Sequence, residues 1–180
     1  QNIVRAVTGA VDNPGKISLS DLKNYRVIER QPVCAPYREY EVCGMGAPSS
    51  GAIALGEILG VLQNQDMKAL GSENIHSWRW IGDASRIAFA DRDHYIGDPA
   101  FVNVPTRALI SQAYLKPRAE EIRQADKALE NIQAGKFGKK YAQGMAVELP
   151  STSHLVVVDK DGNVVSMTTS IENAFGSGLM

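Results

Sequence analysis

The chain has 180 residues, a formal net charge of −1, 44% hydrophobic residues and 22% charged residues. These values are typical of a folded globular domain that is long enough to bury a core. The charges form no basic or acidic block and no apolar run approaches a membrane span, so neither a nucleic-acid partner nor a membrane is expected.

The first part of the chain predicts short helices followed by a strand pair. Residues 1–10 have the apolar spacing of a helix end, and Ser18 or Ser20 is expected to cap a short helical turn. Residues 25–30 and 37–45 alternate as strands do, and Pro36 between them indicates a turn.

The only cysteines, Cys34 and Cys43, lie around this predicted turn. Two cysteines are too few for a disulfide framework, and the three histidines are scattered rather than clustered with them. We therefore interpret both as small, half-buried thiols and expect no metal site.

The middle of the chain predicts mainly helices. One is expected after the loop 46–52, a second over 73–90, a third from a Thr106 cap to Tyr114, and a charged, exposed one over 117–134. One of the two tryptophans of the second helix is expected in the core. Its amphipathic pattern places the following residues on one face: Ile75, Trp78, Ile81, Ser85 and Phe89.

The last part predicts a loop and a hairpin. Residues 135–151 are rich in glycine and lysine, which favours a mobile loop, whereas 155–158 predict a buried strand, 159–163 a hairpin turn and 164–171 the return strand. Helices and a strand pair followed by a hairpin indicate an α/β (α+β layered) domain. We expect it to be truncated at both ends, before its antiparallel sheet is complete.

Thr152 lies where the predicted loop meets the predicted strand. If the bond between Ser151 and Thr152 were cut, Thr152 would carry both a hydroxyl and a free α-amine, whose ordinary pKa of about 8 lets it accept the hydroxyl proton. The branched Cβ would hold the hydroxyl in place. The alternative is ordinary loop chemistry, since a Ser-Thr-Ser triplet before a strand is common.

Several segments of the chain stand out by their order and spacing: Asp21-Leu22 through Glu29-Arg30, Pro48-Ser49-Ser50-Gly51, Ala90-Asp91-Arg92 through Gly97-Asp98-Pro99, and Thr152 to Asn163. Together they resemble segments of the γ-glutamyltranspeptidase family. The small subunit of that family begins Thr-Thr-His, followed by two variable residues and Val-Asp-Lys-Asp-Gly-Asn.

The resemblance implies a central fragment that spans the junction of the large and small subunits. Residues 1–151 would be the end of the large-subunit-like region and 152–180 the start of the small-subunit-like region, within the αββα sandwich of N-terminal-nucleophile (Ntn) hydrolases. An inactive precursor would cut itself between Ser151 and Thr152. Thr152 would then form an acyl-enzyme with γ-glutamyl amides such as glutathione, without cofactor or metal.

Position by position, the resemblance makes Thr152 the nucleophile and places Ser170 where a second threonine supports its amine. His154 matches the family histidine, for which we expect a structural hydrogen bond. Glu172 falls near the substrate's α-carboxylate, and Asn173, one residue on, could substitute there only if the strand register shifts. Many members have asparagine where Glu172 stands, and a carboxylate there would repel that group, which leaves room for a related acylase.

Two other motifs have structural interpretations. Residues 48–52 are expected to cap the following helix through Ser49 or Ser50 rather than to act in catalysis, and Ala52 replaces a usual glycine. The charged segment that contains Asp91, Arg92, Asp93 and Asp98 is expected to fix the loop after a helix by ion pairs and turn hydrogen bonds.

The sequence therefore leaves three functional alternatives. The first is γ-glutamyl transfer or glutathione-type hydrolysis, and the second is an acylase for glutaryl- or poly-γ-glutamyl-type amides. The third is a non-catalytic fragment, because the isolated chain lacks the upstream arginine and the downstream acidic, serine and glycine elements that family members use. Expected partners are a small amide substrate and the rest of the precursor; the resemblance favours a periplasmic or secreted protein, with a cytoplasmic one possible.

Overall fold

The structure, a computed structural model, describes residues 1–12, 14–138, 141 and 152–170. It contains helices and two antiparallel hairpins, and no described helix is long and apolar enough to cross a bilayer. The predicted combination of helices with antiparallel strands is confirmed. The elements are α1 (Asn2–Thr8), α2 (Leu19–Asn24), β1 (Val33–Tyr37), β2 (Tyr40–Gly44), α3 (Gly51–Leu62), α4 (Met67–Leu70), α5 (Ile75–Tyr95), α6 (Thr106–Leu109), α7 (Gln112–Gln124), β3 (Thr152–Val158) and β4 (Val164–Ser170).

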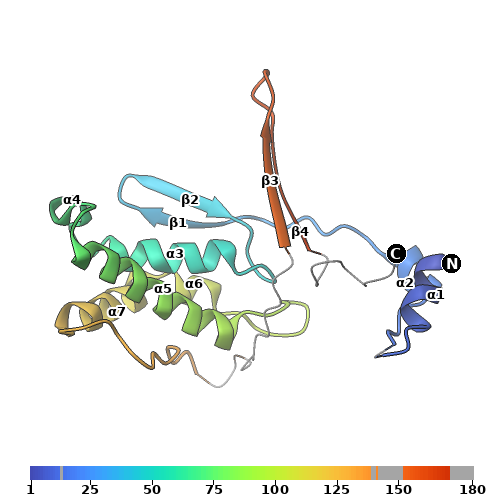
Figure 1. The fold of residues 1–180 in the computed structure, drawn as a ribbon, viewed down its shortest axis with the longest axis horizontal. Coiled ribbons are helices and arrows are strands. Elements are labelled where there is room, and N and C mark those ends of the chain that lie inside the picture. The colour runs from blue at the N-terminus through green and yellow to red at the C-terminus, as the bar shows by residue number, and fades with distance from the viewer. Residues whose placement is uncertain (13, 139–140, 142–151, 171–180) are drawn as a thin grey trace.

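Helices α3, α5 and α7 form the body of the structure, with the β1–β2 hairpin lying along α3 (Figure 1). Helices α1 and α2 lie apart from this body and have no buried residues. Ser18 caps α2 as one of the two predicted alternatives, and Asp21 completes a capping box. The main core cluster consists of Val61, Leu62, Trp80, Ala84, Ile87, Leu115, Ala119 and Ile122.

The β1–β2 hairpin packs against α3 through a close approach of two small residues. Ala35 of β1 is buried, and a Cβ added at Gly56 of α3 would lie 2.9 Å from the Ala35 Cβ and 3.1 Å from Ile110 Cγ2. A larger side chain at residue 56 would therefore push β1 away from the helix.

The first strand of the predicted pair lies later in the chain than expected. Residues 25–30 are not a strand, and the pairing is between β1 and β2, with Tyr37 opposite Tyr40 across the turn at Arg38 and Glu39. The prediction of a turn at Pro36 was wrong. Pro36 lies within β1, and β1 pairs with β2 on one side only. A position whose N–H faces away from the partner strand accommodates proline.

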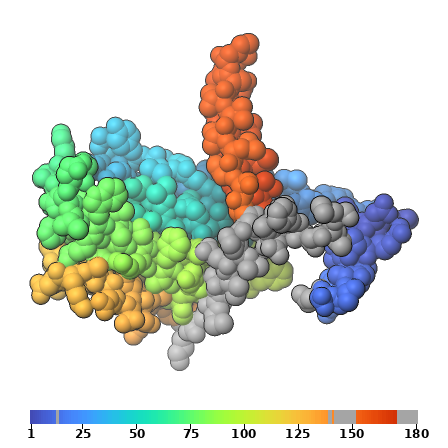
Figure 2. Space-filling model, viewed as in Figure 1, coloured from blue at the N-terminus to red at the C-terminus, as the bar shows by residue number. Residues whose placement is uncertain are grey.

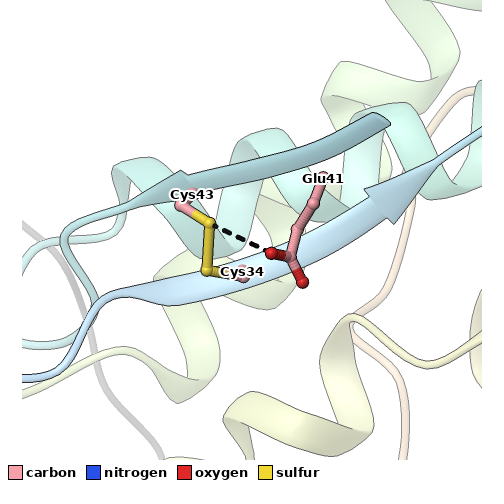
Figure 3. A group of neighbouring side chains, drawn as sticks. All are labelled: Cys34, Glu41 and Cys43. Atoms are coloured by element: carbon pink, nitrogen blue, oxygen red, sulfur yellow. Dashed lines mark hydrogen bonds between the residues drawn. A yellow bond between two sulfur atoms is a disulfide. The ribbon is translucent and has the colours of Figure 1, made fainter. Parts of the chain in front are cut away.

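The two cysteines form a disulfide across this hairpin, which corrects the prediction of thiols (Figure 3). Cys34 and Cys43 are register partners with Cα atoms 4.0 Å apart. A turn does lie between the two cysteines, but at Arg38 and Glu39 rather than at Pro36, and Cys34 lies within β1. Pairing in register, rather than the number of cysteines, brings the two sulfurs together.

Helix α5 buries the face opposite to the one that we singled out. Ile75 and Trp78 are 77% and 63% exposed, whereas Trp80 is only 4% exposed, so one tryptophan lies in the core as predicted. The buried stripe continues through Ala84 and Ile87. The helix carries apolar residues on two faces, and only packing against α3 and α7 distinguishes them.

The helices after α5 have different bounds from those expected. The helix that begins at Thr106 ends at Leu109, and α7 then runs from Gln112 to Gln124 rather than over 117–134. It is not simply exposed, because its apolar stripe enters the core. Residues 125–134 are not helical.

The β3–β4 hairpin forms where predicted but is exposed on both faces, and it stands away from the helical body (Figures 1 and 2). The predicted burial of residues 155–158 is therefore wrong for this structure. Their Val-rich composition fits a strand covered on both faces, but no described element covers them.

The close approach at Gly56 predicts opposite effects for two helix glycines. Gly56→Val should lower the free energy of unfolding by about 1–3 kcal/mol because it overpacks the contact with Ala35. Gly82→Ala in α5, whose added Cβ would meet only Arg86 Nη1 at 3.8 Å, should instead stabilise by about 0.5–1 kcal/mol. Urea unfolding followed by tryptophan fluorescence measures both; equal effects of the two substitutions would contradict the packing argument.

Candidate active site

The turn between β3 and β4 sets the geometry of the predicted nucleophile. Asp159 accepts hydrogen bonds from the backbone N–H groups of Asp161 and Asn163, both at 2.9 Å, and from Asn163 Nδ2 at 2.8 Å. The bonds from Asn163 are the main cause of the lowered pKa of Asp159. Gly162 supplies the left-handed backbone, with φ of 82°. These contacts close a five-residue loop and fix the register of the strands.

This register places Thr152 directly opposite Ser170, the two residues for which the sequence predicts catalytic roles. Opposite residues of an antiparallel pair point to the same face, with Cβ atoms about 4.5–5.5 Å apart. The catalytic roles of Thr152 and Ser170 stay predictions; the register shows only that the two residues are paired. Thr152 is the first residue of β3, so a cut before it would leave its new α-amine at the end of a strand.

His154 occupies the same face, two residues along β3. Its Nδ1 lies 2.7 Å from Thr168 Oγ1, and its Nε2 lies 3.2 Å from Ser166 Oγ. Both hydroxyls belong to β4. The expected structural hydrogen bond of His154 is confirmed, and it links the strands next to Thr152.

The remaining predicted site residues lie outside the part of the chain that the structure describes. These are Ser151 of the processing junction and the substrate-binding candidates Glu172 and Asn173. Thr152 itself is exposed. The described residues therefore present Thr152, the predicted nucleophile, and its cross-strand neighbour, without a substrate pocket around them.

A second polar cluster, which sequence reasoning missed, is buried between α3, α5 and α7. Glu57 is 1% exposed, and its carboxyl group lies beside Asp91. Burial, followed by the negative charge of Asp91, raises the pKa of Glu57 to about 10, which the charge of Arg118 only partly opposes. The raised pKa predicts a neutral Glu57 at physiological pH, and neither of its carboxyl oxygens has a hydrogen-bond partner among the described residues. Its signal in the sequence was a single carboxylate within the apolar run of residues 52–62.

The cluster ties down the segment 133–137, which includes the start of the predicted loop 135–151. Asp91 accepts from the Gly135 N–H at 2.7 Å and from the Tyr114 hydroxyl at 2.5 Å, while the Tyr95 hydroxyl donates to the Gly135 carbonyl. Burial and the hydrogen bond to Asp91 raise the pKa of Tyr114. Arg118 Nη2 donates to the Gln133 carbonyl at 3.0 Å. The start of the predicted mobile loop is thus anchored.

The other motifs have structural roles, mostly as predicted. Ser50 is the N-cap residue of α3 but makes no side-chain cap hydrogen bond; its Oγ instead accepts from Arg92 Nε at 3.1 Å. Two family-like segments therefore meet at the start of α3. Asp98 accepts from the Ala100 N–H at 2.9 Å, a turn hydrogen bond of the expected kind. Arg92 also pairs with Asp93, although both lie in α5 rather than in a loop.

One group of described residues has the spacing of metal ligands. The ligand atoms of Cys34, Glu41 and Cys43 lie within 4.8 Å of one another. Because both sulfurs are joined in the disulfide, they cannot act as thiolate ligands in this state.

Comparisons with known proteins agree with the predicted family. The profile described as gamma-glutamyltranspeptidase matches residues 1–180. A glutathione hydrolase proenzyme of Escherichia coli is 39% identical over 93% of this chain and 28% of its own length. An acylase ACY 1 proenzyme of a Pseudomonas species is 39% identical over 92% of this chain and 28% of its own length. The chain thus spans less than a third of these relatives.

The fold also has a counterpart among solved structures. The crystal structure of cephalosporin acylase from Bacillus halodurans superposes on 99% of this chain and 30% of its own, with a TM-score of 0.75 and 22% sequence identity. The described helices and antiparallel hairpins are therefore part of the Ntn-hydrolase fold, as the sequence predicted. At this identity the match speaks for the fold alone.

The buried carboxyl group predicts a characteristic dependence of stability on pH. Because the folded pKa of Glu57, about 10, exceeds its ordinary value of 4.5, its stabilising contribution is complete below about pH 4.5 and declines as pH rises towards 10. Glu57→Gln removes the titration. Between pH 5 and pH 8, wild-type protein should lose about 2–4 kcal/mol of unfolding free energy relative to this variant.

Urea unfolding at pH 5, 6.5 and 8 checks this expectation. Glu73→Gln, at an exposed position, is the matched control for loss of one negative charge. Parallel pH curves for wild type and Glu57→Gln would show that Glu57 is not a buried neutral acid.

Proposed function

This chain belongs to the gamma-glutamyltranspeptidase family, whose profile matches residues 1–180, and on that premise we propose that the protein carrying it is a self-processing Ntn hydrolase. Its proposed activity is amide hydrolysis or acyl transfer of the glutathione-hydrolase type through Thr152. The observation that carries the proposal is the pairing of Thr152 with Ser170 at the open end of the β3–β4 hairpin.

In the proposed processing step, the Thr152 hydroxyl attacks the carbonyl carbon of Ser151. The peptide C–N bond breaks, an ester joins Ser151 to the Thr152 oxygen, and the Thr152 nitrogen becomes an amine. Water then hydrolyses the ester, which leaves a carboxylate on Ser151 and a free N-terminal Thr152. The cut would separate a large-subunit-like region, 1–151, from a small-subunit-like region that begins at residue 152.

In the proposed catalytic step, the α-amine of Thr152 takes the proton of its own hydroxyl, whose oxygen attacks the substrate amide. An amine with an ordinary pKa of about 8 is partly neutral at physiological pH and can do this without histidine. The proton passes to the leaving amine, and the acyl group remains on Thr152 as an ester. Water or a second amine then takes the acyl group.

Ser170 is proposed to hold the Thr152 amine by a hydrogen bond across the strands. The register supports this role, because it places the two residues opposite each other on one face. His154 is proposed to keep the same end of the hairpin closed through Thr168 and Ser166. No cofactor is needed for these steps, and the remaining binding groups are proposed to come from the rest of the precursor chain.

The leading substrates are γ-glutamyl amides, the class to which glutathione belongs, since a relative 39% identical to this chain is named a glutathione hydrolase. A related acylase is the second candidate, because another relative with equal identity is named an acylase. Glu172 leaves room for an acylase that acts on another amide, since a carboxylate beside the substrate's carboxylate is repulsive. Glutaryl amides carry a carboxylate at the same place as γ-glutamyl amides, so the repulsion would apply to both. Asn173, one residue on, could replace the usual asparagine only if the strand register shifts.

A periplasmic or secreted location is proposed for the protein. The support is the Cys34–Cys43 disulfide, because disulfides persist in oxidising compartments and are rare where glutathione and thioredoxin keep thiols reduced. The disulfide argues against the alternative, a cytoplasmic location.

Self-processing predicts a simple result for the full-length precursor. Wild type should separate into two pieces, the smaller beginning at Thr152, whereas Thr152→Ala should stay uncut. Intact-mass measurement and N-terminal sequencing detect the cut. Ser170→Ala should lower kcat about 10- to 100-fold, and Ser170→Thr should retain activity because it keeps the hydroxyl.

Ser153→Ala is the matched control, because Ser153 pairs with Thr169 and points to the opposite face of the hairpin. It should leave both processing and kcat within about two-fold of wild type. A folded wild-type precursor that remains uncut would refute the proposed nucleophile.

The substrate class is tested with anilides of three acyl groups on the processed protein: γ-glutamyl, glutaryl and an uncharged acyl group. If Glu172 faces the substrate carboxylate, Glu172→Asn should raise kcat/KM about 10-fold for the two charged groups and leave the uncharged one unchanged. A wild type that prefers γ-glutamyl anilide, with no gain in the variant, would rule out the repulsion.

A further inference from the structure

The Cys34–Cys43 disulfide lies on the solvent side of the β1–β2 hairpin. Side chains alternate along each strand, and Ala35 with its register partner Val42 occupies the face that packs on α3. The disulfide and Glu41 therefore share the other face, where Cys43 is exposed and Cys34 half-buried (Figure 3). Of the two cysteines, Cys43 is the more exposed residue, so it is the more accessible to small solutes.

The hairpin has attachments to α3 that do not depend on the disulfide. Ala35 is buried against Gly56, a Cβ at Gly44 would meet the Ala52 Cβ at 3.2 Å, and Val33 packs in the cluster around Ile53. Opening the S–S bond therefore leaves the strand pair and its apolar contact in place. A bond that is exposed, and whose opening does not unfold its surroundings, is suited to reversible exchange.

We propose that Cys34–Cys43 is a thiol–disulfide exchange site for low-molecular-weight thiols, entered at the Cys43 sulfur. A thiol first loses its proton to solvent, and its thiolate attacks Cys43 Sγ. A mixed disulfide forms there while the Cys34–Cys43 bond breaks, and Cys34 leaves as a thiolate that takes up a proton. A second thiolate attacks the mixed disulfide, which gives a free small-molecule disulfide and reduced Cys43. Two thiols supply the two electrons.

Glu41 gives this site a preference for the charge of the incoming thiol. Its Oε2 lies 3.8 Å from Cys43 Sγ (Figure 3). A disulfide sulfur carries no hydrogen, so this contact places a carboxylate charge beside the attacked atom without a hydrogen bond. The whole hairpin, with Arg38 positive and Glu39 and Glu41 negative, has a net charge of −1. Thiols with an extra negative group are repelled, and aminothiols, whose ammonium offsets the thiolate, are favoured.

Exchange rates of the native chain with three thiols test the proposal: cysteamine, 2-mercaptoethanol and mercaptoacetate, each compared per thiolate at low ionic strength. Rates should fall in that order. In Glu41→Gln the ratio of the cysteamine rate to the mercaptoacetate rate should drop about three- to ten-fold. Peptide mass spectrometry should find the trapped mixed disulfide at Cys43, and Trp80 fluorescence should stay native throughout.

Three outcomes would overturn the proposal. The first is exchange that proceeds only at the rate of global unfolding, and the second is a mixed disulfide found mainly at Cys34. The third is an unchanged rate ratio in Glu41→Gln. Glu39→Gln, in the adjacent turn, is the matched control for loss of one negative charge from the hairpin and should change the ratio less than Glu41→Gln.

Discussion

The packing of α3 against its neighbours is the constraint on which the helical body depends. An added Cβ at Gly56 would lie 2.9 Å from the Ala35 Cβ, so β1 approaches the helix at a position where a side chain would force it to shift. An added Cβ at Gly60 would lie 2.3 Å from Leu115 Cδ1, the end of a side chain of α7, which would have to move. Each glycine costs about 1 kcal/mol of helix propensity relative to alanine, and the close contacts offset that cost. The same helix buries Glu57, whose neutral carboxyl group and charged neighbour Asp91 link this packing to the segment that leads towards the predicted cleavage junction.

The candidate nucleophile depends on a different and local interaction. Asp159 organises the turn of the β3–β4 hairpin, and its hydrogen bonds decide which residues face each other at the far end. A shift of one residue would move Thr152 and Ser170 to opposite faces. Two parts of the chain thus have different roles. The packed helical body anchors the region before residue 138, and the β3–β4 hairpin, whose register its own turn fixes, positions Thr152. The exposed apolar residues of that hairpin are the surface that a fuller sandwich of this fold would cover.

The errors in the sequence predictions have physical causes. The apolar residues of α5 fall on two faces, and periodicity cannot choose between Trp78 and Trp80 without knowing what packs on the helix. Pro36 indicated a turn because the sequence does not show on which side a strand is paired. A strand tolerates proline where the backbone nitrogen faces away from the partner strand. The disulfide was missed because the prediction rested on the number of cysteines. A disulfide needs only two cysteines that strand pairing brings into register.

The sequence by itself determined the turn of the β3–β4 hairpin, because turn chemistry is a local property of the chain. The family and the predicted roles of Thr152 and Ser170 came from the resemblance of its motifs. The sequence also offered Ser18 as one of two caps for α2 and predicted a structural hydrogen bond for His154. Only the tertiary structure decided that Glu57 is buried beside Asp91 with a raised pKa, that Ser50 contacts Arg92, and that Cys43 is exposed while the opposite face of its hairpin packs on α3. These properties arise from residues brought together by packing, and the spacing of residues along a chain does not encode the dielectric or the contacts that a distant segment will supply.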